Sequence, residues 1–303
     1  MFATSTLATA AVARPRYRLP VRDGEVVLGE RTWLMGILNA TPDSFSDGGR
    51  FASAEAAIAH GVSLFEAGAD IVDVGGESTR PGGGRVDPDE ERRRVLPVIE
   101  GLRRRAPGLV SVDTSRAEVA RAALDAGADI VNDVSGFRFE PGMARLIAER
   151  RVPAVIMHLR GSFETMHEPT RYRDVADEVV SELDETLRGA ERSGVARSSL
   201  LLDPGLGFSK DAAQTLELLR RLPELARLDR PILVGPSRKS FLGRVLGLPS
   251  GERLLGTAAA VAACVLAGAH VVRVHDVAEM VQVARVCDAI RGEASSPLVE
   301  AAR

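Results

Sequence analysis

The chain has 303 residues, with 39 Lys and Arg against 42 Asp and Glu, and a formal net charge of −3. Hydrophobic residues make up 45% and charged residues 27%, a balance typical of globular proteins. A charge so close to zero argues against a protein that coats nucleic acid, which needs an excess of basic residues. No run of about 18 apolar residues occurs, so we predict no membrane-spanning helix. The two cysteines, Cys264 and Cys287, lie far apart, which excludes a disulfide framework and a cysteine zinc site and fits a reducing cytoplasm.

The two ends of the chain differ in composition from the middle. Residues 1–20 are rich in Ala and Thr, and their first basic residue is Arg14, so positive charge follows the apolar stretch instead of preceding it as in a secretory signal. We expect a disordered extension there, with a transit peptide as the alternative, and a flexible tail over residues 292–303. No Pro/Ser-rich linker interrupts residues 21–291, which are expected to form one domain.

One phrase occurs three times and indicates the architecture. An Ala-Gly-Ala step followed by Asp or His and two β-branched residues stands at residues 67–72, 126–131 and 267–272. An alanine-rich, helix-like run precedes each copy, and a glycine just past a helix adopts the left-handed conformation at low cost. The phrase therefore predicts a helix-to-strand junction. The copies begin 59 residues apart (67 to 126) and 141 residues apart (126 to 267), which corresponds to two and four βα units.

Eight short apolar runs are predicted to be strands, with helical patterns between them. The runs are residues 33–38, 71–74, 110–112, 130–134, 154–157, 200–202, 232–234 and 271–274. Parallel strands covered by helices on the outside are apolar throughout, as these are. The predicted fold is therefore α/β, a single (β/α)8 barrel, and an open doubly wound sheet is the alternative.

Each predicted strand ends in a polar side chain, and catalytic groups of barrels lie at those ends. The polar residues are Asn39, Asp73, Asp113, Asn132 with Asp133, His158, Asp203, residues 237–240, Arg273 and His275. Helix N-caps are the bland explanation for several of them, including Asp113. They do not explain Arg273 between two valines, because burying an unpaired charge is costly. We therefore interpret the set as a binding or catalytic site.

Two loops between these residues are long, rich in glycine and charged. Residues 41–49 and 75–84 fit mobile lids that exclude water, with flexible surface connections as the alternative. Residues 203–208 lack the third glycine of a dinucleotide fingerprint. Residues 235–240 have the wrong spacing for a Walker loop, although they could hold an anion where a helix begins.

The residue types suggest two jobs for the site. Asp203, Asn132 and Lys239 suit a flat, nitrogen-rich ring, because a buried carboxylate pairs well with an amino group and a ring N–H. Arg273, His275, Asn39 and Ser240 suit a phosphate or diphosphate. Carboxylates beside a diphosphate indicate Mg²⁺, which prefers oxygen ligands and the phosphates of the substrate. From these residues alone, the predicted substrate is a heterocycle that carries an anionic leaving group.

Eight segments, in order, closely resemble the dihydropteroate synthase family of pterin-binding enzymes. They are residues 35–49, 73–82, 111–114, 132–136, 157–161, 203–208, 237–241 and 273–277. The resemblance implies a (β/α)8 transferase of folate biosynthesis and a sulfonamide target. Its reaction joins 6-hydroxymethyl-7,8-dihydropterin diphosphate to 4-aminobenzoate and releases 7,8-dihydropteroate and diphosphate. The family also implies a homodimer through the late barrel helices.

The resemblance assigns residues by their position in the motifs. Asp113, Asn132, Asp203 and Lys239 match the pterin pocket. Asn39, Arg273 and His275 match the diphosphate and Mg²⁺ site, with Asn39 as the metal ligand. The surroundings of 4-aminobenzoate and the mobile loops are matched by Phe45, Asp47, Thr79, Arg80, Pro81, Phe208 and Ser240.

The implied mechanism is dissociative and needs no side-chain nucleophile. The diphosphate leaves first, and its charge is taken up by Mg²⁺, Arg273 and His275. Asp113 then stabilises a pterin cation, and Lys239 completes the implied catalytic set.

Three points and two alternative functions stay open at this stage. Leu159 replaces a methionine found in many family members, a swap of similar volume. Residues 162–167 are either a substrate contact or an ordinary loop, and His158 is either functional or structural. The alternative functions are a pterin-dependent methyltransferase domain and a pterin-binding paralogue that has lost turnover.

Overall fold

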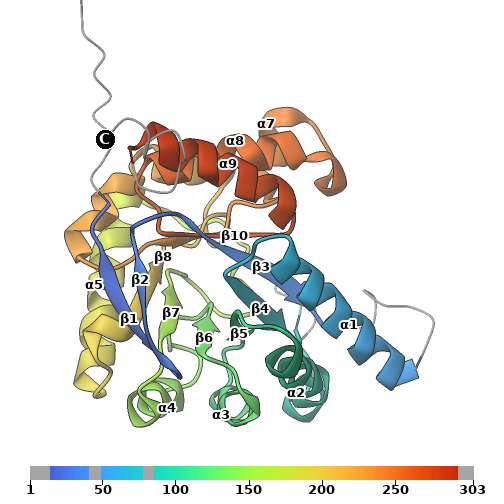
Figure 1. The fold of residues 1–303 in the computed structure, drawn as a ribbon. Helices are drawn as coiled ribbons and strands as arrows, with labels where there is room; N and C mark the ends of the chain where they lie inside the picture. Colours follow the sequence, from blue (N-terminus) through green and yellow to red (C-terminus); the bar gives the residue numbers. More distant parts are fainter. Residues whose placement is uncertain (1–13, 41–48, 78–84, 293–303) are drawn as a thin grey trace, which may run out of the picture.

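A computed structural model of the chain describes residues 14–40, 49–77 and 85–292. Its centre is a sheet of eight parallel strands, paired in the order β8-β7-β6-β5-β4-β3-β10-β9. A parallel bridge between Leu202 and Ile232 joins the two edge strands, β8 and β9, and closes the sheet into a barrel. Helices surround the strands (Figure 1). The predicted (β/α)8 barrel is confirmed, and the open-sheet alternative is wrong.

The barrel strands lie within one residue of the predicted runs at each end. They are β3 (Trp33–Asn39), β4 (Ile71–Gly75), β5 (Leu109–Asp113), β6 (Ile130–Asp133), β7 (Ala154–Met157), β8 (Leu200–Asp203), β9 (Leu233–Val234) and β10 (Val271–Val274). The α-helices are α1 (Gly49–Glu66), α2 (Pro88–Arg105), α3 (Ala117–Ala126), α4 (Gly142–Arg150), α5 (Val175–Arg192), α6 (Ala212–Arg220), α7 (Ser240–Leu246), α8 (Leu254–Leu266) and α9 (Val277–Ile290). Short 3₁₀ helices occupy Arg197–Ser199, Leu222–Leu228 and Ser250–Glu252.

The repeated phrase marks helix-to-strand junctions, as predicted. Its three glycines, Gly68, Gly127 and Gly268, have φ angles of 104°, 115° and 100°. Residues other than glycine rarely adopt this left-handed backbone conformation without strain. The backbone thus turns directly from α1, α3 and α8 into β4, β6 and β10.

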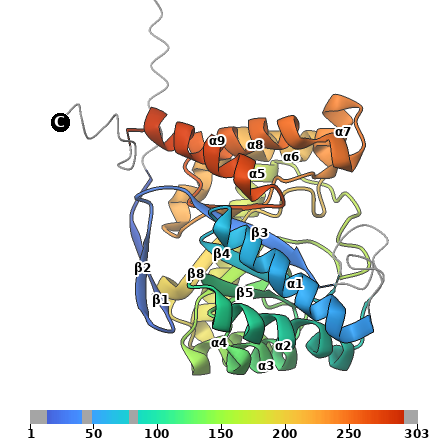
Figure 2. The same cartoon turned by 45° about the vertical axis from the view of Figure 1, so that its right-hand side comes forward.

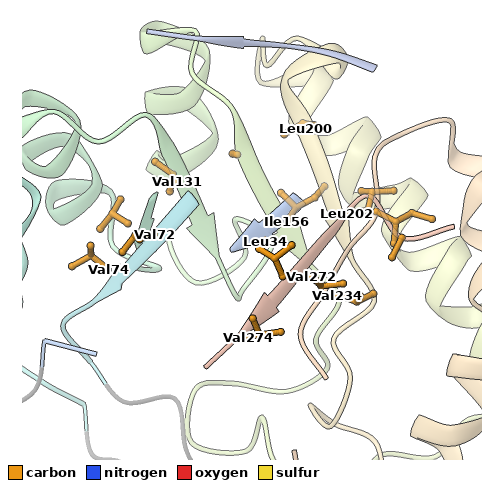
Figure 3. Close-up of a cluster of buried hydrophobic side chains, with 14 of the residues drawn as sticks. Leu34, Val72, Val74, Val131, Ile156, Leu200, Leu202, Val234, Val272 and Val274 are labelled. Carbon is orange, nitrogen blue, oxygen red and sulfur yellow. The ribbon is translucent and has the colours of Figure 1, made fainter. Parts of the chain in front are cut away.

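The strands separate two apolar layers. Alternate side chains, such as Val72 and Val74, point outward and pack under the helices (Figure 3). The lower half of the barrel interior holds a second cluster, Met35, Ile71, Ile130, Val155, Leu201, Leu233 and Val271. This cluster fills the end of the barrel where the strands begin and leaves the opposite end for polar side chains.

An N-terminal hairpin covers the apolar end of the barrel, which corrects the expected boundary at residue 20. Strands β1 (Tyr17–Val21) and β2 (Gly24–Leu28) pair antiparallel, and Figure 2 shows them beside the barrel. Leu19 and Leu28 are fully buried against the interior cluster. Residues 14–20 are therefore part of the fold, because they bury apolar surface. The rest of the expected extension, residues 1–13, and residues 293–303 of the expected tail lie outside the described residues.

Arg14 fastens the chain just before the hairpin. Its guanidinium is completely buried, donates to Asp288 Oδ1 on α9 at 2.8 Å, and donates to Thr32 Oγ1 at 2.7 Å. Breaking a buried ion pair leaves the other charge uncompensated, which is strongly destabilising. This contact joins residues near the two ends of the barrel domain in sequence.

No helix in the described part of the chain is long and apolar enough to cross a membrane.

The buried pair predicts how the hairpin contributes to stability. We expect Arg14→Ala to lower the free energy of unfolding by about 3 kcal/mol or more, because Asp288 is left buried without its partner. Arg18→Ala is the matched control, because its pair with Glu25 is exposed and is worth less than about 1 kcal/mol. Urea unfolding followed by circular dichroism measures both. Equal, small losses in the two variants would contradict a fastening role for Arg14.

Candidate active site

A cavity of about 470 Å³ opens at the carboxyl ends of the strands. Every residue that the family resemblance assigns to the site, where described, lines it: Asn39, Asp113, Asn132, Asp203, Phe208, Lys239, Ser240, Arg273 and His275. Three other polar residues at strand ends, Asp73, Asp133 and His158, do not line it. The remaining predicted residues, Phe45, Asp47, Thr79, Arg80 and Pro81, lie outside the described residues. A larger cavity of about 880 Å³ lies between α4 and α5, outside the barrel; of the polar strand-end residues it is lined by His158, and by none of the residues that the resemblance assigns. The chemistry therefore points to the smaller one.

The pleat of the strands explains why polar side chains converge there. Because Ile71 belongs to the barrel interior, Asp73 two residues later on β4 points to the same side. The same step leads from Val271 to Arg273 on β10, from Ile130 to Asn132 on β6 and from Leu201 to Asp203 on β8. The interior of the barrel thus changes from apolar to polar within one pleat.

Arg273 forms the charged floor of the cavity. Its Nε donates to Asp73 Oδ2 and one Nη donates to Asp113 Oδ2, both at 2.7 Å. Burial raises the pKa of Asp113 to about 7, because its charged form loses water. The Arg273 charge opposes that rise, and the nearby Asp73 charge adds to it. Asp113 is therefore a carboxyl group that can change its charge near neutral pH.

Lys239, Asp203 and Phe208 form one wall of the cavity. Burial lowers the pKa of Lys239 to about 8, against the opposing charge of Asp203. Burial also raises the pKa of Asp203, although the backbone N–H of Gly205 donates to its Oδ1 at 2.7 Å. The Lys239 Nζ lies 3.9 Å from the centre of the Phe208 ring, a cation–π contact. The wall combines a cation, an anion and an aromatic face.

His167 extends this wall and shows that the segment 162–167 contributes to the cavity. Its ring stacks on Phe208, with centroids 5.2 Å apart and planes 27° apart, and it lines the cavity. Phe163 and Met166 pack with Phe208 in a small apolar cluster behind it. This segment is therefore part of the cavity wall, a role that its sequence left open.

His275 and Asn39 also line the cavity: His275 directly follows β10, and Asn39 is the last residue of β3. Ser237 Oγ accepts from the backbone N–H of His275 at 3.2 Å and lies 3.0 Å from its Nδ1, which fixes the imidazole. Among the described residues, no group of three or more His, Cys, Asp or Glu side chains is arranged to hold a metal ion. A divalent cation here would depend on Asn39 and on oxygens supplied by a ligand.

Lys210 is a residue of this site that sequence reasoning missed. Its ammonium is buried beneath the loop after β8 and has three acceptors: Gly205 O at 3.2 Å, Phe208 O at 3.1 Å and His158 Nδ1 at 2.9 Å. Burial lowers the pKa of Lys210 to about 7 and that of His158 to about 4. A neutral His158 accepts from Lys210 and donates from Nε2 to Glu182 at 3.0 Å. His158 is thus structural, and it supports the lysine that holds the Phe208 loop.

One signal could have found Lys210. Only two of the 39 basic residues are lysines, Lys210 and Lys239, and the other 37 (39 − 2) are arginines. Both lysines lie at this site. A rare residue type repeated at one place indicates a chemical requirement.

The chain matches the family described as pterin binding enzyme over residues 35–275. It is 48% identical to dihydropteroate synthase of Synechocystis over 273 residues, which cover 90% of this chain and 94% of that protein. The chain belongs to the dihydropteroate synthase family. This membership favours the synthase over the methyltransferase alternative.

Solved structures of the family have the same fold. Xanthomonas albilineans dihydropteroate synthase with 4-aminobenzoic acid superposes with a TM-score of 0.86 at 43% identity, covering 93% of this chain and 100% of that one. The Yersinia pestis dihydropteroate synthase in a sulfonamide drug complex gives 0.85 at 39% identity, covering 90% and 99%. The dihydropteroate synthase fold therefore extends over the whole barrel.

The contacts of Lys210 predict its effect on the cavity wall. Lys210→Met keeps the volume but removes the donor shared by two carbonyl oxygens, so we expect faster amide hydrogen exchange over residues 205–209 and a lower melting temperature. Arg171→Met, an exposed basic residue nearby, is the control. Hydrogen exchange followed by mass spectrometry measures the effect. Unchanged protection of the loop in Lys210→Met would show that Lys210 does not stabilise the conformation of residues 205–209.

Proposed function

We propose that this chain condenses 6-hydroxymethyl-7,8-dihydropterin diphosphate with 4-aminobenzoate, giving 7,8-dihydropteroate and diphosphate. The observation that carries the proposal is the convergence of nine predicted residues from most of the barrel strands and their following loops on one cavity. Family membership supports the same reaction. A binding protein without turnover is the remaining alternative, and the assay below separates the two.

The pterin ring is assigned to the deep part of the cavity. Asp203 and Asn132 offer a carboxylate and an amide to the amino group and ring nitrogens, and Lys239 donates to a ring oxygen or nitrogen. Asp113 lies beside Arg273 at the cavity floor. These groups recognise a heterocycle by hydrogen bonds that water cannot replace in a narrow, largely buried site.

The diphosphate is assigned to Arg273, His275 and Asn39. An arginine that keeps its charge and a fixed imidazole suit an anionic leaving group. The described residues fit Mg²⁺ that is bound mainly by the phosphates of the substrate, because Asn39, which lines the same cavity as Arg273 and His275, offers an oxygen ligand. Neutralisation of the diphosphate oxygens is the chemistry that Mg²⁺ supplies when bound.

The reaction proposed for this site is dissociative. The bond between the pterin methylene carbon and the diphosphate oxygen breaks, and its electron pair leaves with the diphosphate toward Arg273 and His275. Positive charge then spreads over the methylene and the ring, where the ionised Asp113 stabilises it. The amine of 4-aminobenzoate donates its lone pair to the methylene carbon, and the resulting ammonium then gives one proton to water. Because the carbon is already cationic, this weak nucleophile needs no base of high strength.

The 4-aminobenzoate is assigned to the wall formed by Phe208, Lys239 and Ser240 at the mouth of the cavity. The aromatic face of Phe208 suits the ring, and the Lys239 ammonium and Ser240 suit its carboxylate. Phe45, Asp47, Thr79, Arg80 and Pro81 are proposed to complete this part. Sulfonamides share the amino-substituted ring, and the drug complex of the Yersinia pestis relative supports the proposal that they inhibit this chain.

A homodimer is proposed through α7, α8 and α9. All the large, exposed apolar side chains found among the described residues lie between residues 245 and 290, on or beside these helices: Val245, Leu246, Leu248, Leu254, Leu255, Leu266, Val286 and Ile290. The three helices lie together along one side of the barrel (Figure 1). An apolar patch of this kind marks an interaction surface, and a second copy brings an identical patch.

A reducing, cytoplasmic setting is proposed for the enzyme. Cys264 and Cys287 are both free thiols and both buried, so neither needs an oxidising compartment to fold.

Asp113 predicts the pH dependence of the reaction. With its pKa near 7, kcat/KM for the pterin diphosphate rises with pH as Asp113 loses its proton, and falls above about 8 as Lys239 loses its own. Asp113→Asn should keep the fold, cut kcat by about 100-fold or more and remove the acid limb. A coupled assay of diphosphate release with both substrates and Mg²⁺ measures this. Wild-type protein that binds pterin without release is the paralogue alternative, and full turnover in Asp113→Asn contradicts the role of Asp113.

The apolar patch predicts the oligomeric state. Wild-type chain should sediment at twice its mass of 32.3 kDa, whereas Leu255→Asp with Val286→Asp should sediment as a monomer with an unchanged melting profile of the barrel. Ser181→Asp, at an exposed position on α5, is the control and should remain a dimer. A monomeric wild type at micromolar concentration would contradict the dimer.

A further inference from the structure

Asp73 is a fully buried carboxylate at the centre of the site that the assignments above leave without a role. It lies on β4, beneath the cavity and outside its lining. One oxygen, Oδ2, accepts two hydrogen bonds, from Arg273 Nε at 2.7 Å and from Asn132 Nδ2 at 2.9 Å. These donors belong to β10 and β6, on either side of β4 in the barrel. A single carboxylate oxygen therefore joins the diphosphate-binding and pterin-binding parts of the site.

The first effect of this contact is on the amide of Asn132. An amide side chain has two orientations that exchange its oxygen and nitrogen. With Nδ2 donating to Asp73, the oxygen points elsewhere as an acceptor. The flipped amide would place its oxygen against the Asp73 carboxylate, where two acceptors repel. Asp73 thus decides which atoms Asn132 presents to a ligand.

The second effect is on the guanidinium of Arg273. Its Nε donates to Asp73 and one Nη donates to Asp113, so two carboxylates on neighbouring strands fix the planar group at two points. A planar guanidinium held at two points has a defined plane, and its remaining N–H groups have defined directions. Such preorganisation removes the need to order a long side chain when an anion binds.

We propose that Asp73 is a positioning residue that sets the orientation of the Asn132 amide and of the Arg273 guanidinium at once. The proposal rests on the roles given above to these two residues. Asp73 touches neither substrate; it acts through the groups that do. The competing explanation is that Asp73 only neutralises a buried arginine and matters for stability alone.

Asp73→Asn is the decisive variant because it keeps the shape and removes the charge. Binding of 6-hydroxymethyl-7,8-dihydropterin, measured by calorimetry, should weaken about 10-fold, because the Asn132 amide loses its charged anchor. Binding of the diphosphate ester should weaken about 100-fold, because Arg273 loses its anchor as well. The acid limb of the kcat/KM profile should also move to lower pH, because the Asp73 charge helps to raise the pKa of Asp113. A purely stabilising role predicts a lower melting temperature with both affinities intact.

Ser111→Ala is the matched control. Ser111 faces Asp73 on the neighbouring strand β5, and within the described part of the chain its Oγ and Asp73 Oδ1 are both buried without a hydrogen-bond partner. If Asp73 acts through Oδ2, Ser111→Ala should bind both ligands like wild type. Losses in Ser111→Ala equal to those in Asp73→Asn would show that buried polarity between the two residues matters, and would overturn the proposal. A folded Asp73→Asn with both affinities within about twofold of wild type would overturn it too.

A second comparison covers the case in which Asp73→Asn fails to fold because Arg273 is left partly unpaired. The Arg273→Gln variant buries one charge fewer than wild type. The double variant Asp73→Asn/Arg273→Gln buries two charges fewer. The double variant should bind the free pterin about 10-fold more weakly than Arg273→Gln alone, since only the Asn132 contact then differs. Equal binding overturns the proposal. Wild-type protein that neither binds pterin nor releases diphosphate contradicts the proposed function itself, which keeps the two failures separate.

Discussion

The site depends on keeping three buried charges, those of Arg273, Asp73 and Asp113, close together inside a closed barrel. Moving a single charge out of water costs several kcal/mol, and only partners at hydrogen-bond distance offset that cost. The two carboxylates come from β4 and β5, and the arginine comes from β10, 200 residues after Asp73 and 160 after Asp113. Pairing of β10 with β3 places the last barrel strand two strands away from β4 and three away from β5. The strand order therefore brings the ion pairs together, and side chains that point into the barrel meet there.

The polar layer in turn depends on the apolar layer beneath it. Water entering from the other end of the barrel would raise the local dielectric and weaken every contact of Arg273. Met35, Ile71 and their neighbours fill that end, and Leu19 and Leu28 of the hairpin cover it. Arg14, bound to Asp288, fastens the chain where it enters the hairpin. A segment remote from the cavity therefore helps to keep the cavity floor dry.

Sequence alone located the barrel strands because both their signals are local. Buried parallel strands are continuous apolar runs, and the glycine at each repeated junction adopts a conformation that other residues avoid. The hairpin escaped notice because its strands carry charged residues, Arg18 and Glu25, and only three of its side chains, Tyr17, Leu19 and Leu28, are deeply buried.

Some residues of the site could also be predicted from local sequence signals, and others could not. Residues at strand ends, such as Asp203 and Arg273, stand out because a charge interrupts an apolar run. Lys210 does not, since it lies in a loop after an ordinary turn, and its role arises from His158, Gly205 and Phe208, which meet only in the folded chain. Asp73, Asn132 and Arg273 all stand out as strand-end residues, but the hydrogen bonds that join them form only in the folded chain.

Low dielectric in the cavity moves acids and bases toward the same pH range. Burial raises the pKa of Asp113 to about 7 and lowers that of Lys239 to about 8, because in both cases it disfavours the charged form. Arg273 cannot respond in this way, since a guanidinium keeps its proton. The site thus combines one fixed positive charge with two groups that can change charge near neutral pH.

The choice between arginine and lysine follows from this difference. The 37 arginines (39 − 2) serve wherever a permanent charge or a planar fork suffices, as in the pairs on the helix surfaces. The two lysines occupy positions that a guanidinium does not suit. At Lys210 a compact ammonium fits among three converging acceptors, and at Lys239 a point charge lies 3.9 Å from the Phe208 ring and can also lose its proton. In a chain that otherwise uses arginine throughout, a lysine indicates a place where the size and the acidity of the cation both matter.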